Sequence, residues 1–185
     1  MKPDMKNNGF SLIELLVVMS IIATFSVALI LNFRVSSTNT SARQQAASVI
    51  VSDIRRAQTM ALAGSRFGGN TICGYGIHYI NSSSYLIYAG ADEGLPMCSN
   101  TNHNYQAGVD FLVETKIIQN INMEIRSSFA DIFFEPPDPR VYLNNNSSLA
   151  IPPVTITIQV KGQASCAVGT CTDIKIYTSG RLDVL

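Results

Sequence analysis

The chain lacks an excess of charge of either sign. Its 13 Lys and Arg residues balance 13 Asp and Glu residues in a sequence of 185 residues. A domain that binds nucleic acid usually carries a basic excess, and an acidic tail carries the opposite excess. The composition therefore predicts neither class.

Motifs of common catalytic and metal sites are also missing from the sequence. It contains no Gly-x-Ser-x-Gly elbow, no His-Glu-x-x-His helix and no phosphate-binding loop. Only two histidines occur, His78 and His103, and no two cysteines have the Cys-x-x-Cys spacing of a zinc or redox site. His78 lies in an alternating segment where a packed histidine is the usual case, and His103 lies in an Asn-rich loop. We therefore expect no enzyme activity, no cofactor and no metal.

What the sequence does contain is a long apolar run behind a short polar leader. Residues 10–33 include one charged residue, Glu14, and as a helix they would extend roughly 36 Å, more than the ~30 Å of a bilayer core. The leader, residues 1–9, carries two lysines and ends at Gly9. An ordinary secretory signal places its apolar segment before the cleavage site, whereas here it follows Gly9. We expect a transmembrane helix over 10–33, with the leader on the cytoplasmic side and the C-terminal domain exported.

Glu14 is the unusual residue of the apolar run. A carboxylate inside a membrane helix costs about 2.5–3.5 kcal/mol on insertion scales, so its presence calls for a cationic partner. The alternative is an uncleaved signal anchor, in which Glu14 lies at the membrane boundary and extends its carboxylate to water.

The segment Gly9-Phe10-Ser-Leu-Ile-Glu14 resembles the processing site of type IV prepilins and pseudopilins. In that family a prepilin peptidase cuts between the Gly and the Phe, and the new N-terminal residue is methylated. The resemblance implies cleavage between Gly9 and Phe10, N-methylation of Phe10, and assembly into a helical filament. It also implies that Glu14 pairs with the N-terminal ammonium of Phe10 in a neighbouring subunit.

A looser resemblance points to one branch of this family. Residues 53–61, the Phe133-Phe134-Glu-Pro run and residues 174–182 look like the GspH/FimT-type minor pilins and minor pseudopilins. This implies a low-copy subunit at the tip of a type IV pilus or a type II secretion pseudopilus, held in the inner membrane with a periplasmic domain. The implied partners are prepilin peptidase, other minor and major pilins or pseudopilins, and inner-membrane lipid. A major pilin of the filament shaft is the alternative.

Some pilus members of this branch bind DNA through a C-terminal Gly-Arg-x-Arg motif. The matching positions are Gly180, Arg181, Leu182 and Asp183, so an acid replaces the second arginine. A carboxylate at that position repels phosphate. We therefore expect Arg181 to be a solvated charge at the end of a strand, and DNA binding in a DNA-uptake pilus is the alternative.

The four cysteines, Cys73, Cys98, Cys166 and Cys171, form an even set in the part expected to be exported, where disulfides persist. Four cysteines allow three pairings. Cys166 and Cys171 enclose Ala-Val-Gly-Thr, a turn-like segment between two strand-like runs, so a local disulfide is predicted there. Cys73 would then pair with Cys98 by default.

The helical pattern continues beyond the membrane segment. No Pro or Gly occurs from Arg34 to Ala63, and apolar residues recur at spacings of three, four and seven. The predicted apolar stripe comprises Val35, Ala42, Ala46, Val49, Ile50, Ile54, Ala57 and Ala61, whereas Arg43, Gln44, Gln45, Asp53 and Arg56 fall elsewhere on the helix. We expect one helix from about residue 10 to residue 63, amphipathic over 34–63 and stopped by Gly64.

The remaining part, 64–185, has the pattern of short strands separated by turn signals. The predicted strands are 75–80, 84–89, 111–118, 123–126, 132–134, 140–143, 154–161 and 174–178, and the predicted loops are 92–106, 136–139 and 144–148. Strict alternation over 154–160 indicates a strand with one buried face. The predicted fold class is α+β: a long N-terminal helix, with its first half in the membrane, packed on antiparallel β-sheets as in pilins.

Overall fold

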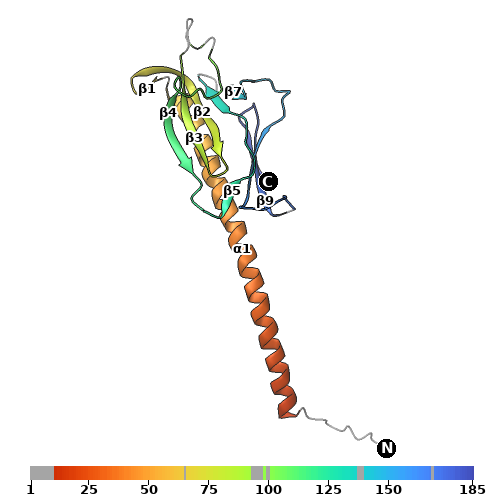
Figure 1. Cartoon of the computed structure of the whole chain (residues 1–185). Coiled ribbons are helices and arrows are strands. Elements are labelled where there is room, and N and C mark those ends of the chain that lie inside the picture. Colours follow the sequence, from red (N-terminus) through yellow and green to blue (C-terminus); the bar gives the residue numbers. More distant parts are fainter. Residues whose placement is uncertain (1–10, 65, 93–97, 99–100, 137–139, 168) are drawn as a thin grey trace, which may run out of the picture. The chain divides into compact units, whose positions relative to one another are not determined.

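The computed structural model describes residues 11–64, 66–92, 98, 101–136, 140–167 and 169–185, and for residues 31–37 it describes the backbone only. The chain divides into two units, Met1–Asn39 and Thr40–Leu185. One helix, α1 (Leu12–Ala63), contributes residues to both units, and all described strands belong to the second (Figure 1). The predicted α+β class is confirmed. The leader, 1–9, and Phe10 lie outside the described residues.

The predicted continuous helix is present. α1 contains 52 residues and ends at Ala63, directly before Gly64. Gly64 is not among the described glycines that have a positive φ. It therefore ends the helix without the left-handed conformation that glycine often adopts at this position.

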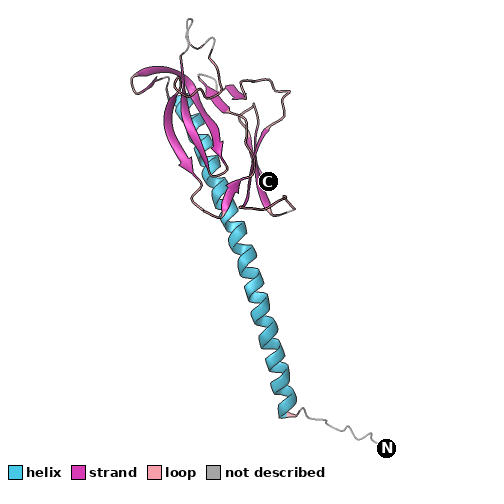
Figure 2. Ribbon diagram, in the orientation of Figure 1, coloured by secondary structure: helices cyan, strands magenta, loops and turns pink. Residues whose placement is uncertain are grey.

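The described part of the chain contains ten strands (Figure 2). They are β1 (Arg66–Phe67), β2 (Asn70–Asn81), β3 (Ser84–Ala91), β4 (Phe111–Ile117), β5 (Met123–Ile125), β6 (Ile132–Glu135), β7 (Arg140–Leu143), β8 (Val154–Val160), β9 (Cys171–Ile176) and β10 (Leu182–Val184). Each of the eight predicted strands corresponds to one of these, with shifted boundaries. β1 and β10, which contain two and three residues, were not predicted.

These strands form two antiparallel sheets. The six-stranded sheet has the order β4-β3-β2-β6-β7, with β1 paired to β2, and the four-stranded sheet has the order β10-β9-β8-β5. β2 and β3 form the predicted hairpin, in which Asn81 lies opposite Ser84. The side-chain oxygen of Asn81 accepts a hydrogen bond from the backbone N–H of Ser83 at 2.8 Å, which stabilises the turn.

The main hydrophobic core joins α1 to the inner faces of both sheets. Its fully buried members include Ile54 and Ala57 of α1, Ile77 and Ile87 of the six-stranded sheet, and Ile156, Ile158, Ile174 and Ile176 of the four-stranded sheet. The alternation predicted for 154–160 therefore places Ile156 and Ile158 in this core. Burial of a single such side chain contributes about 1.5–3 kcal/mol relative to its exposure.

The buried face of α1 differs from the predicted stripe. Ile50, Ile54, Ala57 and Ala61 are buried as predicted, but Val49 is 44% exposed, and Ala42 and Ala46 are only partly buried. Arg43 and Asp53, predicted to lie away from the buried face, are only 5% and 7% exposed. The prediction was wrong at Val49, Arg43 and Asp53 because Ala and Val residues also occur on the helix faces beside the predicted stripe. Which row becomes buried depends on the surfaces that the sheets present.

Asp53 is buried because the six-stranded sheet provides polar partners. The hydroxyl of Tyr85, on β3, donates a hydrogen bond to the Asp53 carboxylate at 2.6 Å, and Lys116 Nζ lies 3.8 Å from the other carboxylate oxygen. Burial, followed by the hydrogen bond to Asp53, raises the pKa of Tyr85 above its usual range. Near this pair, Glu114 of β4 contacts both Arg56 and Lys116, at 2.6 and 2.7 Å. The buried contact between Asp53 and Tyr85 fixes the position of the helix along β3. The more exposed pairs of Glu114 contribute less.

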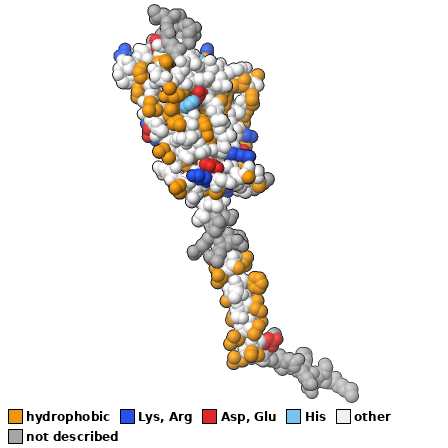
Figure 3. All heavy atoms as spheres, in the orientation of Figure 1, with side chains coloured by type: hydrophobic (Ala, Val, Ile, Leu, Met, Phe, Trp, Pro, Cys, Tyr) orange, Lys and Arg blue, Asp and Glu red, His pale blue; other side chains and the backbone are white. Residues whose placement is uncertain are grey.

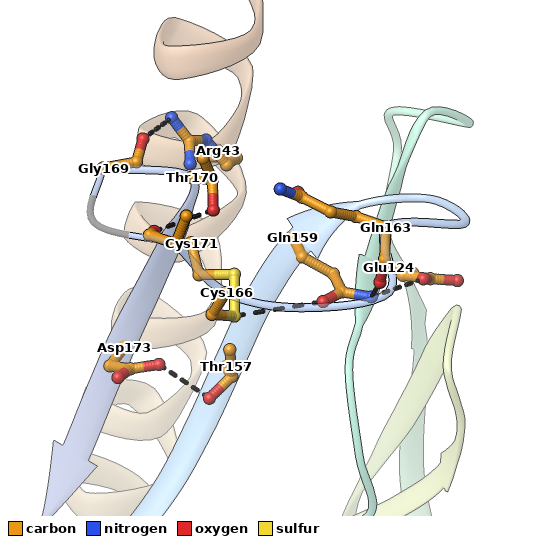
Figure 4. Close-up of a disulfide and its surroundings, with 11 residues drawn as sticks. Arg43, Glu124, Thr157, Gln159, Gln163, Cys166, Gly169, Thr170, Cys171 and Asp173 are labelled. Atoms are coloured by element: carbon orange, nitrogen blue, oxygen red, sulfur yellow. Dashed lines mark hydrogen bonds between the residues drawn. A yellow bond between two sulfur atoms is a disulfide. The ribbon is translucent and has the colours of Figure 1, made fainter.

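A buried arginine of α1 contacts the loop that is closed by one of the two disulfides. Cys166 and Cys171 are bonded, and the loop between them turns at Gly169, whose φ is 77° (Figure 4). The guanidinium of Arg43, on α1, donates to the carbonyl oxygen of Gly169 at 2.7 Å and to the Thr40 hydroxyl at 3.1 Å. This disulfide loop therefore holds the part of α1 that begins the second unit.

The other disulfide joins Cys73 of β2 to Cys98, in the connection between β3 and β4. The Cα–Cα distances of the two disulfides are 5.4 and 5.5 Å, within the usual range. Both pairs are those predicted from the sequence.

A first prediction tests the buried polar contact of the helix. Tyr85→Phe removes the hydroxyl that donates to Asp53 and leaves the buried carboxylate without this partner. We expect the free energy of unfolding to fall by about 1–3 kcal/mol. Denaturant unfolding of the detergent-solubilised chain measures this change. Tyr79→Phe, on the neighbouring strand, is the matched control, and an equal loss in both variants would contradict the role of the hydrogen bond.

A second prediction ranks the disulfides. Closing loops with sequence separations of 25 and 5 restricts the unfolded chain by roughly 3.5 and 2 kcal/mol. The double substitution of Cys73 and Cys98 by Ala should therefore destabilise the chain more than that of Cys166 and Cys171. Thermal unfolding of the two variants compares them. The reverse order would show that the Arg43 contact, rather than loop length, determines the contribution of the smaller loop.

Candidate processing and assembly site

The start of α1 is capped by Ser11. Its hydroxyl accepts a hydrogen bond from the backbone N–H of Glu14 at 3.3 Å, and its carbonyl oxygen accepts from the N–H groups of Glu14 and Leu15 at 3.1 and 3.2 Å. A serine followed three residues later by a glutamate is the sequence of a capping box. This role of Ser11 was not predicted, although the Ser-x-x-Glu spacing is present in the sequence.

Glu14 lies in the first turn of α1, and its side chain is exposed in the single chain. A carboxylate at this position interacts favourably with the positive end of the helix dipole. No ion pair of Glu14 is found among the residues that the structure describes. The carboxylate is therefore available to a cation from outside the described chain, and its pairing with a neighbouring subunit remains a prediction.

The first part of α1 is apolar and unpartnered. Leu12–Ile30 is long and apolar enough to cross a bilayer, with a mean hydropathy of 2.5 over 19 residues, and its side chains are exposed (Figure 3). The hydroxyls of Ser20, Thr24 and Ser26 each donate to a backbone carbonyl three or four residues earlier, at 2.8 Å. These hydroxyls are thus satisfied within the helix, as an environment without water requires.

Arg181 is engaged by its neighbours at the start of β10. Its guanidinium lies 4.1 Å from the centre of the Tyr177 ring and 3.0 Å from the carboxylate of Asp183. Hydrogen bonding to Tyr177 and the charge of Asp183 raise the pKa of Arg181. The Arg181 side chain is 62% exposed. The acid that replaces the second arginine of the DNA-binding motif therefore lies directly against the first.

The two histidines lie where a loop covers the outer face of the six-stranded sheet. His78, on β2, faces Asp131 with 2.6 Å between Nδ1 and Oδ1. His103 stacks on Tyr142 with 3.5 Å between the ring centres, and its Nδ1 lies 2.6 Å from the side-chain oxygen of Asn145. Sequence spacing identified no partner for His103, because its partners are about 40 residues away in the chain. Both histidines contribute to packing of this loop.

One group of described residues brings three side chains of metal-ligating types, two cysteines and an aspartate, close together. Atoms of Cys73, Asp92 and Cys98 lie within 4.8 Å of one another. The two sulfur atoms are bonded to each other, so they do not provide the thiolates that zinc requires. Asp92 instead accepts a hydrogen bond from the backbone N–H of Cys98 at 3.1 Å.

Comparison with known proteins identifies the N-terminal segment. A model of the prokaryotic N-terminal methylation motif matches residues 4–30. No curated protein and no solved structure matches the chain. The matched range contains Gly9, Phe10 and Glu14, together with the whole apolar segment Leu12–Ile30. The chain therefore carries the prokaryotic N-terminal methylation motif, which is the motif of type IV prepilin-like proteins, as the resemblance implied.

Proposed function

We propose that this chain is a minor pilin or pseudopilin that is assembled into the tip of a type IV pilus or of a type II secretion pseudopilus. The match to the methylation motif over residues 4–30 carries this proposal, because the motif is continuous with an apolar helix capped at its start. The loose resemblance of residues 53–61 and 174–182 to the GspH/FimT-type proteins supports the minor role. The subunit acts by assembly and not by catalysis.

The proposed function assigns a role to each segment of the chain. Residues 1–9 are a leader removed by prepilin peptidase, 10–33 span the inner membrane, 34–63 continue the helix, and 64–185 form a periplasmic β domain. The two disulfides support an exported location, since disulfides persist in oxidising compartments. Other minor and major pilins or pseudopilins are the assembly partners.

DNA binding is the less favoured function. Asp183 lies 3.0 Å from Arg181, and Arg56 is paired with Glu114 at 2.6 Å. Both contacts reduce the positive potential that phosphate binding requires. A major pilin of the filament shaft is the other alternative, and the number of copies per filament distinguishes it from a minor subunit.

A third prediction concerns processing. The mature chain should begin at Phe10, N-methylated, when it is produced with an active prepilin peptidase. Mass spectrometry of the membrane-extracted protein measures this directly. Replacing Gly9 by Val should retain the leader, while Ser11→Ala, which removes only the cap, should be processed normally. An intact leader on the unsubstituted chain would refute the assignment.

A fourth prediction separates the charge of Glu14 from its place in the helix cap. Glu14→Ala should leave membrane insertion intact, because it removes a charge that costs about 2.5–3.5 kcal/mol in a membrane helix. The same variant should weaken incorporation beside neighbouring subunits, which copurification of filament partners measures.

Glu14→Gln is the matched variant, since glutamine also serves at this position of a capping box but carries no charge. It should lose incorporation as Glu14→Ala does. Normal incorporation of Glu14→Gln would show that capping, rather than pairing of charges, is the role of Glu14.

A further inference from the structure

The loop between β8 and β9 carries one of the two disulfides and contacts α1. β8 ends at Val160 and β9 begins at Cys171, which is bonded to Cys166, five positions earlier. Gly169 lies inside the closed part, and its carbonyl oxygen accepts a hydrogen bond from the Arg43 guanidinium at 2.7 Å (Figure 4). This contact joins residues 126 positions apart in the chain. The covalent state of the disulfide therefore acts on a contact between the strands and the helix.

Arg43 depends on this contact because its charge is buried. Only 5% of the residue is exposed. The Thr40 hydroxyl, which accepts from the same guanidinium at 3.1 Å, belongs to α1 and not to the sheets. A buried charge that loses a hydrogen-bonded partner is strongly destabilised. Displacement of Gly169 therefore weakens the packing of α1 around residue 43.

The half of the loop that follows β8 has anchors that do not involve the disulfide. Gln159, at the end of β8, is 4% exposed, and its amide donates to the Glu124 carboxylate at 2.8 Å and to the Gln163 carbonyl oxygen at 3.0 Å. The backbone N–H of Gly162 donates to the same Glu124 oxygen at 3.1 Å. These contacts do not require a closed disulfide.

The half of the loop that precedes β9 carries Gly169. The N–H and the hydroxyl of Thr170 both donate to the Ala167 carbonyl oxygen, at 2.9 and 2.8 Å, so these hydrogen bonds stay within the closed part. The bond between Cys166 and Cys171 connects this half to the anchored half. Opening the bond removes that restraint, so Gly169 gains freedom to move away from Arg43.

The two disulfides differ in their access to a reductant. Cys166 is exposed and Cys171 is partly buried, whereas Cys73 of the other disulfide is 1% exposed. Reduction begins with attack of a thiolate on a sulfur atom, and exposed disulfides are the labile or regulatory ones. The disulfide that contacts α1 through its loop is therefore the one that a reductant reaches first.

We propose that the Cys166–Cys171 disulfide is a redox-sensitive lock on α1. When the bond is closed, Gly169 is held against Arg43 and the start of the packed part of the helix is fixed. A dithiol opens the lock: its two thiols become a disulfide, and two electrons and two protons pass to Cys166 and Cys171, which become thiols. A protein disulfide of the thiol–disulfide oxidoreductase class reverses the reaction and restores the contact.

The coupling between the disulfide and the helix contact is reciprocal. If the closed disulfide favours the Arg43 contact by a given factor, the contact favours closure of the disulfide by the same factor. The lock goes beyond the proposed function and does not depend on it, because its contacts all lie within Thr40–Leu185. In an exported subunit, closure would follow transfer to an oxidising compartment.

Hydrogen exchange of the full chain in detergent tests the lock from the side of the disulfide. In the double variant Cys166→Ser and Cys171→Ser, the amides of residues 40–48 should exchange roughly fivefold faster or more, because the hydrogen bond to Arg43 is weakened. Residues 54–61 are the internal control and should keep their rates, since Ile54, Ala57 and Ala61 are fully buried in the main core. The double variant Cys73→Ser and Cys98→Ser is the matched control, and it should not raise exchange at 40–48 relative to 54–61.

A redox equilibrium tests the same coupling from the side of the helix. In a buffer of reduced and oxidised glutathione, Arg43→Gln should lower the equilibrium constant for closure of the Cys166–Cys171 bond by a similar factor. Thiol alkylation followed by mass spectrometry measures the fraction closed. Arg55→Gln, at an exposed arginine of the same helix, is the matched control and should leave this constant unchanged. The Cys73–Cys98 equilibrium, measured in the same samples, should also be unchanged.

Each experiment can overturn the lock. Unchanged exchange at residues 40–48 after removal of the Cys166–Cys171 bond would do so, as would an equal increase at 40–48 and 54–61, which indicates general destabilisation. An unchanged closure constant in Arg43→Gln, or a decrease that the Cys73–Cys98 bond shares, would also contradict it. Leader cleavage and Glu14-dependent incorporation test the proposed function separately, and their outcome does not bear on the lock.

Discussion

The second unit depends on the burial of one face of α1 between two sheets. Ala47, Ala57 and Ala61 are small enough to let the strands approach the helix closely, and Ile50 and Ile54 fill the space between them. Neither sheet could bury its inner face without this helix, because the residues of both sheets and of α1 belong to the same core. The helix thus serves as the common packing surface of the unit.

Two buried charged residues fix where the sheets lie along this helix. Arg43 is bonded to the Gly169 carbonyl of the disulfide loop, and Asp53 is bonded to Tyr85 of the six-stranded sheet. An apolar stripe alone tolerates displacement along the helix, whereas a charge removed from its buried partner costs several kcal/mol. Arg43 therefore fixes the four-stranded sheet near the start of the packed part of the helix, through the disulfide loop. Asp53 fixes the six-stranded sheet near the middle of this part.

The surfaces that remain unpartnered in the single chain are consistent with a protein that acts by assembly. The helical segment Leu12–Ile30 buries none of its side chains within the chain. In the second unit Val49, Ile117, Ile121 and Leu149 are exposed. Apolar surface of this extent is unfavourable in water, at about 25 cal/mol per Å². A membrane and neighbouring subunits would cover such surfaces in the function that we propose.

Apart from the Cys73–Cys98 disulfide, which was predicted only by default, the features predicted correctly come from local patterns in the sequence. They are the methylation motif within residues 4–30, the apolar segment, the end of the helix at Ala63, most strands and the Cys166–Cys171 disulfide. These depend on residues that are close in the chain, so periodicity, spacing and turn chemistry are sufficient to predict them. Only the tertiary structure decided that Arg43 and Asp53 are buried while Val49 is exposed, and that His103 stacks on Tyr142. The physical reason is that the free energy of burying a residue depends on the surface opposite it, and here that surface comes from strands and loops about 30 to 130 residues later in the chain.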